Sequence, residues 1–260
     1  MESLRTNVNQ VCSDFRNIKD AIVSSGVEVA DGTPTAEYAD KVNEVYEQGK
    51  KSQYDKFWDT FQDNGNRTDY SYAFRMPWSE EHWIPKYDIR PTTAINMFVG
   101  VQVVDLVEHQ AKHNFVIDFS MCTNLQQMGS GNRYIERFGV VDTRSASSLM
   151  APLNSIWSLK KVDEFILKED GSQTFSYPPF GGCNKLTDLT IKGKIGNTVS
   201  FADNKALTDE SLKGEYGIIP ALLDLTGTGK TATITLHADS KAKLSDSEKA
   251  IITQKGWTIA

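Results

Sequence analysis

The sequence has few cysteines, no excess of positive charge and no long hydrophobic run. Its 260 residues include three cysteines, Cys12, Cys122 and Cys183, which lie far apart and nowhere form the C-x-x-C spacing of a zinc or redox site. An odd number of separated cysteines also argues against a disulfide framework, so we expect all three to be small buried apolar side chains. We expect no metal site and no cofactor.

The balance of charge restricts the class of partner. The chain has 28 Lys and Arg against 34 Asp and Glu, a formal net charge of −6. Nucleic-acid backbones are usually bound by a basic face, so we expect no nucleic-acid partner. No apolar run approaches the ~18 residues of a membrane span, and the N-terminus lacks a basic segment followed by an apolar one. We therefore expect no membrane insertion and folding in a cytoplasm.

Residues 1–25 have the apolar spacing of an amphipathic helix. Steps of four and three residues, as at the a and d positions of a coiled coil, separate Leu4, Val8, Val11, Phe15, Ile18 and Ile22. A lone helix of this length is marginal in water, so the stripe packs either within the chain or on other copies. The second alternative predicts a homo-oligomer through residues 4–22, with a trimer as one option. Thr33 and Pro34 predict the start of a second helix over 33–64.

Residues 66–94 are rich in aromatic residues and proline and have no clear period. Every stack of structural repeats needs a cover over its first open edge, so we interpret this segment as an aromatic N-terminal cap. Trp78 and Trp83 are the candidates in this cap for contact with a ligand.

From residue 95 to 206, apolar residues recur at every third position in short groups. These groups begin about 20 to 35 residues apart, within or near the range of one structural repeat each. The clearest copies run from Phe119 through Cys122 to Leu125, and from Phe180 through Cys183 to Leu186. The expected core positions are Phe98, Val101, Val104, Val107, Phe119, Cys122, Leu125, Met128, Leu153, Ile156, Leu159, Val162, Phe180, Cys183, Leu186 and Leu189. We expect each group to form an inward turn and a short strand, stacked on its neighbours as a parallel sheet.

Residues 207–260 differ from the preceding groups and predict a C-terminal repeat or cap. We expect a helix from Leu207 to about Leu225 and a strand over 232–236. Ser245, followed by acidic residues, predicts the N-cap of another helix, and a last strand is expected over 257–259.

The two F-x-x-C-x-x-L copies and the C-terminal segments L-T-D-E-S-L, L-T-G-T-G-K-T-A-T-I-T-L-H and K-G-W-T resemble BspA-type leucine-rich-repeat proteins. The likeness is to those encoded near tail genes of phages and prophages of gut Firmicutes. It implies an α+β repeat fold: N-terminal helices, with a coiled coil as an option, followed by a short leucine-rich-repeat solenoid with a parallel β-sheet and capped ends. The stretch from Gly129 to Leu149 lacks a clean copy, so one repeat is degenerate or carries an insertion.

The resemblance implies a recognition protein without enzymatic chemistry. We expect a phage tail-associated or receptor-binding protein, assembled in the host cytoplasm and carried on the virion, with other tail proteins and a host surface glycan or protein as partners. The alternatives are an adhesin on a bacterial cell surface and, more weakly supported, a carbohydrate-active enzyme. Ligand contact is expected at polar positions between core residues, namely Lys160, Lys161, Asp163, Thr187, Asp188 and Thr190, or else at Trp78 and Trp83.

Two motifs invite a chemical interpretation, and we reject both. The segment ending in Gly229, Lys230 and Thr231 resembles a P-loop, but Asp224 stands where the first glycine is required. His109 and His113 have a spacing that can share a metal on a helix, yet no third ligand is close in sequence, and we expect exposed loop histidines. We expect no catalytic residues.

Overall fold

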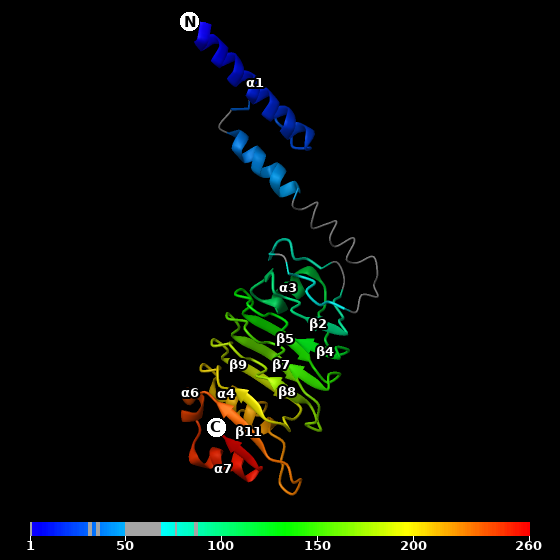
Figure 1. Cartoon of the computed structure of the whole chain (residues 1–260), viewed down its shortest axis with the longest axis vertical. Helices are drawn as coiled ribbons and strands as arrows, with labels where there is room; N and C mark the ends of the chain where they lie inside the picture. The colour runs from blue at the N-terminus through cyan, green and yellow to red at the C-terminus, as the bar shows by residue number, and fades with distance from the viewer. Residues whose placement is uncertain (1, 31–32, 35–36, 50–68, 76, 86–87) are drawn as a thin grey trace. The chain divides into compact units, whose positions relative to one another are not determined.

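The computed structural model describes residues 2–30, 33–34, 37–49, 69–75, 77–85 and 88–260. The chain divides into two compact units, Met1–Asp63 and Asn64–Ala260. The described part is a mixed α/β structure with several parallel sheets (Figure 1).

The first unit is helical. Helix α1 covers Glu2–Ser24, as the apolar spacing predicts, and Gly26 follows it in a left-handed conformation with φ of 86°. A second helix is present over 38–49, and the remainder of the expected helix lies outside the described residues. The two helices share a small core of Ile22, Val27 and Val29, against which Tyr38 and Val45 pack.

Among the side chains of the α1 stripe that the structure describes, some are covered within the chain and others are exposed. Ile22 is buried, and the ring of Phe15 lies 5.9 Å from that of Tyr38. Val11 and Ile18 remain 52% and 40% exposed. Intrachain packing therefore accounts for part of the predicted stripe and leaves part of it open to solvent.

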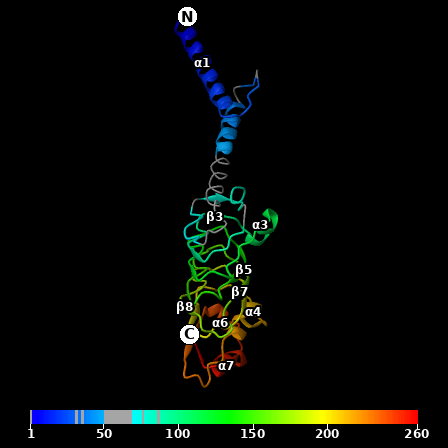
Figure 2. The same cartoon turned by 90° about the vertical axis from the view of Figure 1, so that its right-hand side faces the viewer.

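The second unit is built from short strands that pair in parallel (Figures 1 and 2). One sheet has the order β2-β4-β6-β8, another β5-β7-β9, a third β10-β11-β12, and β1 pairs with β3. The strands are β1 Trp78–Ser79, β2 Thr93–Ile95, β3 Val101–Gln102, β4 Asn124–Gln126, β5 Arg137–Asp142, β6 Ser148–Met150, β7 Lys161–Ile166, β8 Thr174–Tyr177, β9 Asp188–Lys192, β10 Val199–Phe201, β11 Ala232–Leu236 and β12 Trp257–Ile259. The helices are α3 Leu106–His113, α4 Asp209–Lys213, α5 Ile218–Ala221, α6 Ala238–Ala242 and α7 Asp246–Gln254.

From β4 to β9 the chain visits two sheets alternately. Each strand pairs with the next strand but one in the sequence. As a result β4, β6 and β8 share one sheet, and β5, β7 and β9 share the other. Parallel strands need a crossover between them, and here the strand of the opposite sheet lies within that crossover.

The two F-x-x-C-x-x-L copies occupy the core, as predicted. Phe119, Cys122, Phe180 and Cys183 are all buried, because each aromatic residue and cysteine points inward from a turn. The Phe180 ring contacts the neighbouring turns, with its centroid 5.1 Å from that of Phe165 and 6.1 Å from that of Phe201. The side chain of Cys12 lies outside the described ones.

Two buried asparagines hold adjacent turns together. The amide Nδ2 of Asn132 donates to the carbonyls of Phe98 and Val101, at 2.8 and 2.7 Å, and its Oδ1 accepts from two backbone amides of its own turn. Asn204 repeats the pattern by donating to the carbonyls of Phe180 and Cys183. A buried side chain that satisfies backbone groups of two turns fixes their spacing.

The segment from Gly129 to Leu149 is a full turn with different core residues. It begins at the turn that contains Asn132, continues through β5 and ends in β6. Its buried side chains include Ile135, Phe138 and Val141. Asn132 occupies the position that holds an apolar residue or cysteine in other turns. The F-x-x-C-x-x-L motif is therefore not recognisable in the sequence of this segment.

Two sequence predictions need correction. Val104 is exposed and Val107 only half-buried, because Asp105 caps helix α3 and the every-third-residue pattern ends there; Val103 and Leu106 are buried instead. The expected helix over 207–225 is two short helices, α4 and α5, separated by Gly214 and Gly217.

The C-terminal predictions are confirmed for both strands and for the last helix. Strand β11 has the predicted bounds, and β12 pairs with it. Ser245 caps α7 in a capping box with Glu248, and each residue satisfies a backbone amide of the other.

Candidate ligand-binding face

The outward face of the β5-β7-β9 sheet collects four of the predicted ligand-binding residues. Lys161 and Asp188 lie in register on neighbouring strands, and Asp163 and Thr190 follow them two positions later on the same face. Successive residues of a strand point to opposite faces, so the buried Val162 and Leu189 between them face the core. We call this surface the sheet face.

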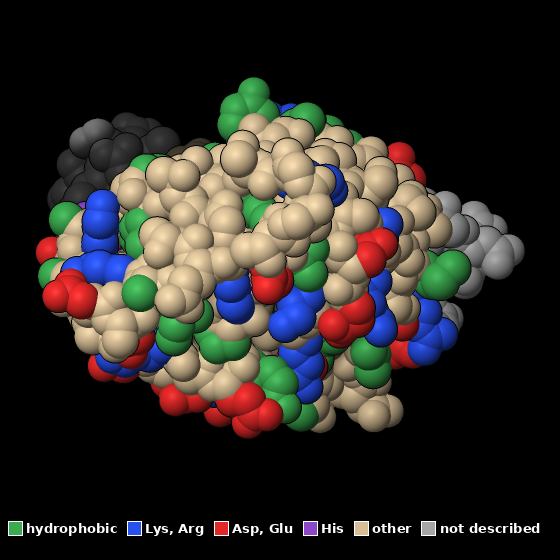
Figure 3. All heavy atoms as spheres, turned by 90° about the horizontal axis from the view of Figure 1, so that it is seen from below, with side chains coloured by type: hydrophobic (Ala, Val, Ile, Leu, Met, Phe, Trp, Pro, Cys, Tyr) green, Lys and Arg blue, Asp and Glu red, His purple; other side chains and the backbone are tan. Residues whose placement is uncertain are grey.

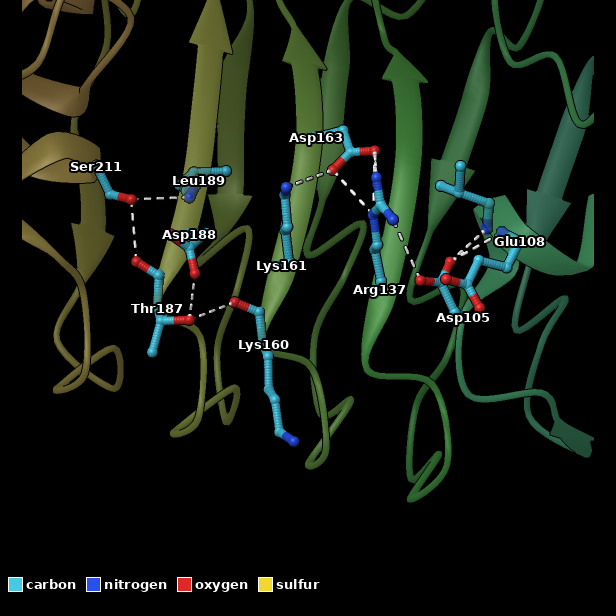
Figure 4. Close-up of polar contacts among 11 residues, drawn as sticks. Asp105, Glu108, Arg137, Lys160, Lys161, Asp163, Thr187, Asp188, Leu189 and Ser211 are labelled. Carbon is cyan, nitrogen blue, oxygen red and sulfur yellow. Dashed lines mark hydrogen bonds and ion pairs between the residues drawn. The ribbon is translucent and has the colours of Figure 1, made fainter.

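Arg137 organises the sheet face at its β5 edge. Its guanidinium donates to both oxygens of Asp163, the shortest contact being 2.8 Å, and also to Asp105 at 3.2 Å (Figure 4). Lys161 lies 3.4 Å from the same Asp163 carboxylate. The hydrogen bond to Asp163, with the smaller contribution of Asp105, raises the pKa of Arg137. Because the other oxygen of Asp105 caps α3, this network ties helix α3 to β5 and β7.

Further ion pairs cross the same sheet. Lys160 lies 2.7 Å from Glu136, and Lys192 lies 2.8 Å from Glu164 while its ammonium sits 5.5 Å from the centre of the Tyr216 ring. Exposed pairs of this kind contribute little to stability, typically below about 1 kcal/mol. They do bring oppositely charged side chains of neighbouring chain segments into contact on this face.

Thr187 immediately precedes β9, and its polar groups are hydrogen-bonded within the fold. Its hydroxyl is 2.9 Å from the carbonyl of Lys160 and 2.6 Å from Asp188, and its own carbonyl accepts from Ser211 (Figure 4). The Ser211 hydroxyl also accepts from the amide of Leu189 at 2.8 Å. Thr187 therefore links neighbouring turns.

Trp78 and Trp83 are not surface residues, which corrects their assignment as candidate ligand contacts. Both are 0% exposed. Phe74 packs edge-on against both rings, with centroids 6.5 and 5.3 Å away, and Trp83 also contacts Phe98. They form the aromatic interior at this end of the second unit, so neither indole presents a face to a ligand.

A groove of about 480 Å³ lies beside the sheet face, between α3 and strand β5. Val107 and Ala111 of α3 line one side, Gly139 and Val140 of β5 line the other, and Asp163 contributes a carboxylate at the rim. A Cβ atom at Gly139 would lie 3.1 Å from Val107, so glycine allows the helix to approach the strand. This volume is within the usual range of about 300 to 1,000 Å³ for small-ligand sites.

The groove also lies on an open strand edge. β5 is the outermost strand of its sheet, and the amide of Arg137 donates away from β7, to the carbonyl of Val104. Gly139, two residues further along β5, lines the groove, and the half-exposed Val140 follows it.

The histidine interpretation also needs correction. His109 and His113 are on helix α3, and His109 is 1% exposed with its ring stacked on Trp83. Within the described part of the chain, no group of three or more His, Cys, Asp and Glu side chains is arranged to hold a metal ion. Lys230 follows a turn that leads into a strand, as expected for a segment that is not a P-loop.

The two described cysteines are scaffold residues. Burial raises the pKa of the Cys122 thiol to about 11 and that of the Cys183 thiol to about 12. Thiols are nucleophilic as thiolates, and these two are almost entirely protonated at neutral pH.

Sequence reasoning missed Arg137, Val140 and the pair of Arg133 and Trp157. The Arg133 guanidinium lies 4.5 Å from the centre of the exposed Trp157 ring. These residues carry no motif, and alternation along β5 would have placed Arg137 and Val140 on opposite faces, because the buried residues Phe138 and Val141 are three positions apart. At the C-terminal end, Figure 3 shows basic and acidic side chains interspersed and hydrophobic ones in small separate groups.

Comparisons with protein-family models, curated proteins and solved structures found no match to this chain. Among the described residues, no helix combines the length and apolar character that a membrane crossing requires.

Proposed function

We propose that the chain is a non-enzymatic recognition protein whose second unit is a short leucine-rich-repeat solenoid. Support for the solenoid comes from the alternation of strands between two parallel sheets and from the buried F-x-x-C-x-x-L turns. In this proposal the protein is associated with a phage tail and recognises a host surface glycan or protein.

The observation that carries the recognition proposal is the ordered sheet face with the groove at its edge. Arg137 and Lys161 are ion-paired to Asp163, and the groove beside them has apolar walls. A surface whose side chains are already ordered loses less conformational entropy on binding. Val140 is an exposed apolar side chain at the groove, and a bound partner would cover it.

A binding screen with matched variants tests the proposal. Purified protein is applied to host cells, to a glycan array and to host surface proteins. Val140→Glu should weaken binding at least tenfold, because it places a charge in the apolar groove. Met121→Glu, at a more exposed apolar residue that is not among those lining the groove, should bind like the unaltered protein. Equal binding by both variants would remove the groove from the proposal, and hydrolysis of a glycan would replace recognition with catalysis.

We further propose that α1 makes the protein oligomeric through its exposed stripe. Val11 and Ile18 lie at coiled-coil spacing and are open to solvent, and Phe15 between them is partly exposed beside Tyr38. Several copies on one assembly would raise the avidity of a weak binding face.

A further inference from the structure

Two opposite faces of helix α3 make different contacts. One face, with Val107 and Ala111, is a wall of the groove, and the opposite face carries His109. His109 is packed beneath the aromatic interior formed by Trp83 and Phe115, whose ring centroids lie 5.6 and 5.9 Å away. The contacts of His109 therefore help to hold a wall of the proposed binding groove.

His109 is bound as a neutral ring. Its Nε2 lies 2.6 Å from the carbonyl of Trp83, which can only accept, so Nε2 carries the hydrogen. Its Nδ1 is buried without a hydrogen-bond partner and lies 3.9 Å from the half-exposed carboxylate of Glu80. A proton arriving at His109 must therefore go to Nδ1, a site with no direct acceptor.

A second imidazole packs against His109. His113, one turn further along α3, has its ring centroid 4.5 Å from that of His109, and its Nε2 is also buried without a partner. The charged and titratable groups that act on His109 are Glu80 from the aromatic segment and His113 and Lys112 from α3 itself. Of these three groups, the half-exposed carboxylate of Glu80 favours the charged form of His109, and His113 and Lys112 oppose it.

We propose that His109 is a pH-sensitive latch, which holds α3 against Trp83 when its ring is neutral and releases the helix when the ring is protonated. Release would move a wall of the groove, so acid would weaken ligand binding. The ligand part of this inference rests on the proposed function, whereas the latch itself does not.

The sign of the pH dependence follows from burial. Desolvation lowers the pKa of His109, helped by His113 and Lys112 and opposed by the Trp83 carbonyl and Glu80. The unfolded pKa is about 6.5, so the stabilisation is complete above that pH and is lost as the pH falls from there toward the lower folded value. Each unit of depression corresponds to a tenfold loss in the closed-to-open ratio.

Hydrogen exchange on the full chain tests the latch without any ligand. After correction for intrinsic rates, protection of the α3 amides should fall by up to about tenfold between pH 7.5 and 5.5. His109→Gln keeps a donor for the Trp83 carbonyl but cannot titrate, so its α3 protection should change much less. His237→Gln, at a histidine in the C-terminal part, should behave as the unaltered chain does.

An NMR titration of the histidine ring protons keeps the test decisive if His109→Gln folds poorly. The His109 resonance should titrate below 6.5 in the unaltered chain. An ordinary midpoint, or α3 protection that is unchanged between the two pH values, would overturn the latch. If exchange shows the latch while ligand binding is absent at every pH, the proposed function fails and the latch stands.

Discussion

At the scale of single residues, buried polar side chains matter as much as the apolar repeat. Asn132 and Asn204 replace an apolar residue or cysteine at the inward position of their turns and bond to carbonyls of the turn before. Such a position tolerates asparagine because four hydrogen bonds at Asn132 compensate for the loss of water.

Replacing Asn132 by alanine should destabilise the second unit strongly. The change removes one donor from each of the carbonyls of Phe98 and Val101, and we expect a loss of about 3 kcal/mol in the free energy of unfolding. Urea denaturation followed by tryptophan fluorescence measures it. The control is Asn184→Ala, at an exposed asparagine, which should cost less than about 0.5 kcal/mol. Similar losses in the two variants would contradict the structural role of Asn132.

At the scale of elements, close approach between turns requires glycine at a few places. Gly193 follows β9 with φ of 86°, and a Cβ atom there would lie 2.2 Å from the carbonyl oxygen of Leu167. Gly227 has a similar φ of 71°, but a Cβ atom there would meet nothing within 4 Å. Comparing substitutions at Gly193 and Gly227 therefore distinguishes the cost of backbone strain from the cost of a steric clash.

Alanine at these two glycines should therefore have unequal effects. Gly227→Ala incurs only the cost of a left-handed alanine, about 1 to 2 kcal/mol. Gly193→Ala adds a clash with backbone and should cost about 3 kcal/mol or more, by moving β9 away from β7. Thermal denaturation of both variants measures the difference, and equal melting temperatures would mean that the turns separate without penalty.

The sequence predicts elements well where one local rule decides them. The spacing around Phe180 and Cys183, the strand over 232–236 and the cap at Ser245 are of this kind. The prediction that Val104 is a core residue was wrong. The every-third-residue pattern continues through it in the sequence, but Asp105 begins a helix, which has a different period.

The candidate site was predictable only in part. Alternation along β7 and β9 places Lys161, Asp163 and Asp188 outward, as expected. The groove depends on how α3 docks beside β5, and that docking is decided by long-range contacts of Asp105 with Arg137 and of His109 with Trp83. Contacts between residues so distant in the chain leave no local pattern.

At the scale of the whole molecule, oligomerisation through α1 is testable with surface substitutions. Val11→Glu combined with Ile18→Glu places charges on the exposed stripe and should convert the oligomer to a monomer, because a coiled-coil seam excludes unpaired charge. Light scattering after size-exclusion chromatography measures the mass. Asn17→Glu, on an exposed residue outside the stripe, should leave the mass unchanged. A monomeric unaltered chain would end the proposal.

The strand order has a consequence for how such a chain can change over generations. Because β7 bonds only to β5 and β9 within its sheet, and β6 only to β4 and β8, the natural unit of gain or loss is one complete turn. Duplication of a turn would preserve the register of every other strand, whereas deletion of a single residue within one would turn its side chains to the wrong face. Related chains should thus differ in length by whole turns, and the width of the sheet face would vary in the same steps.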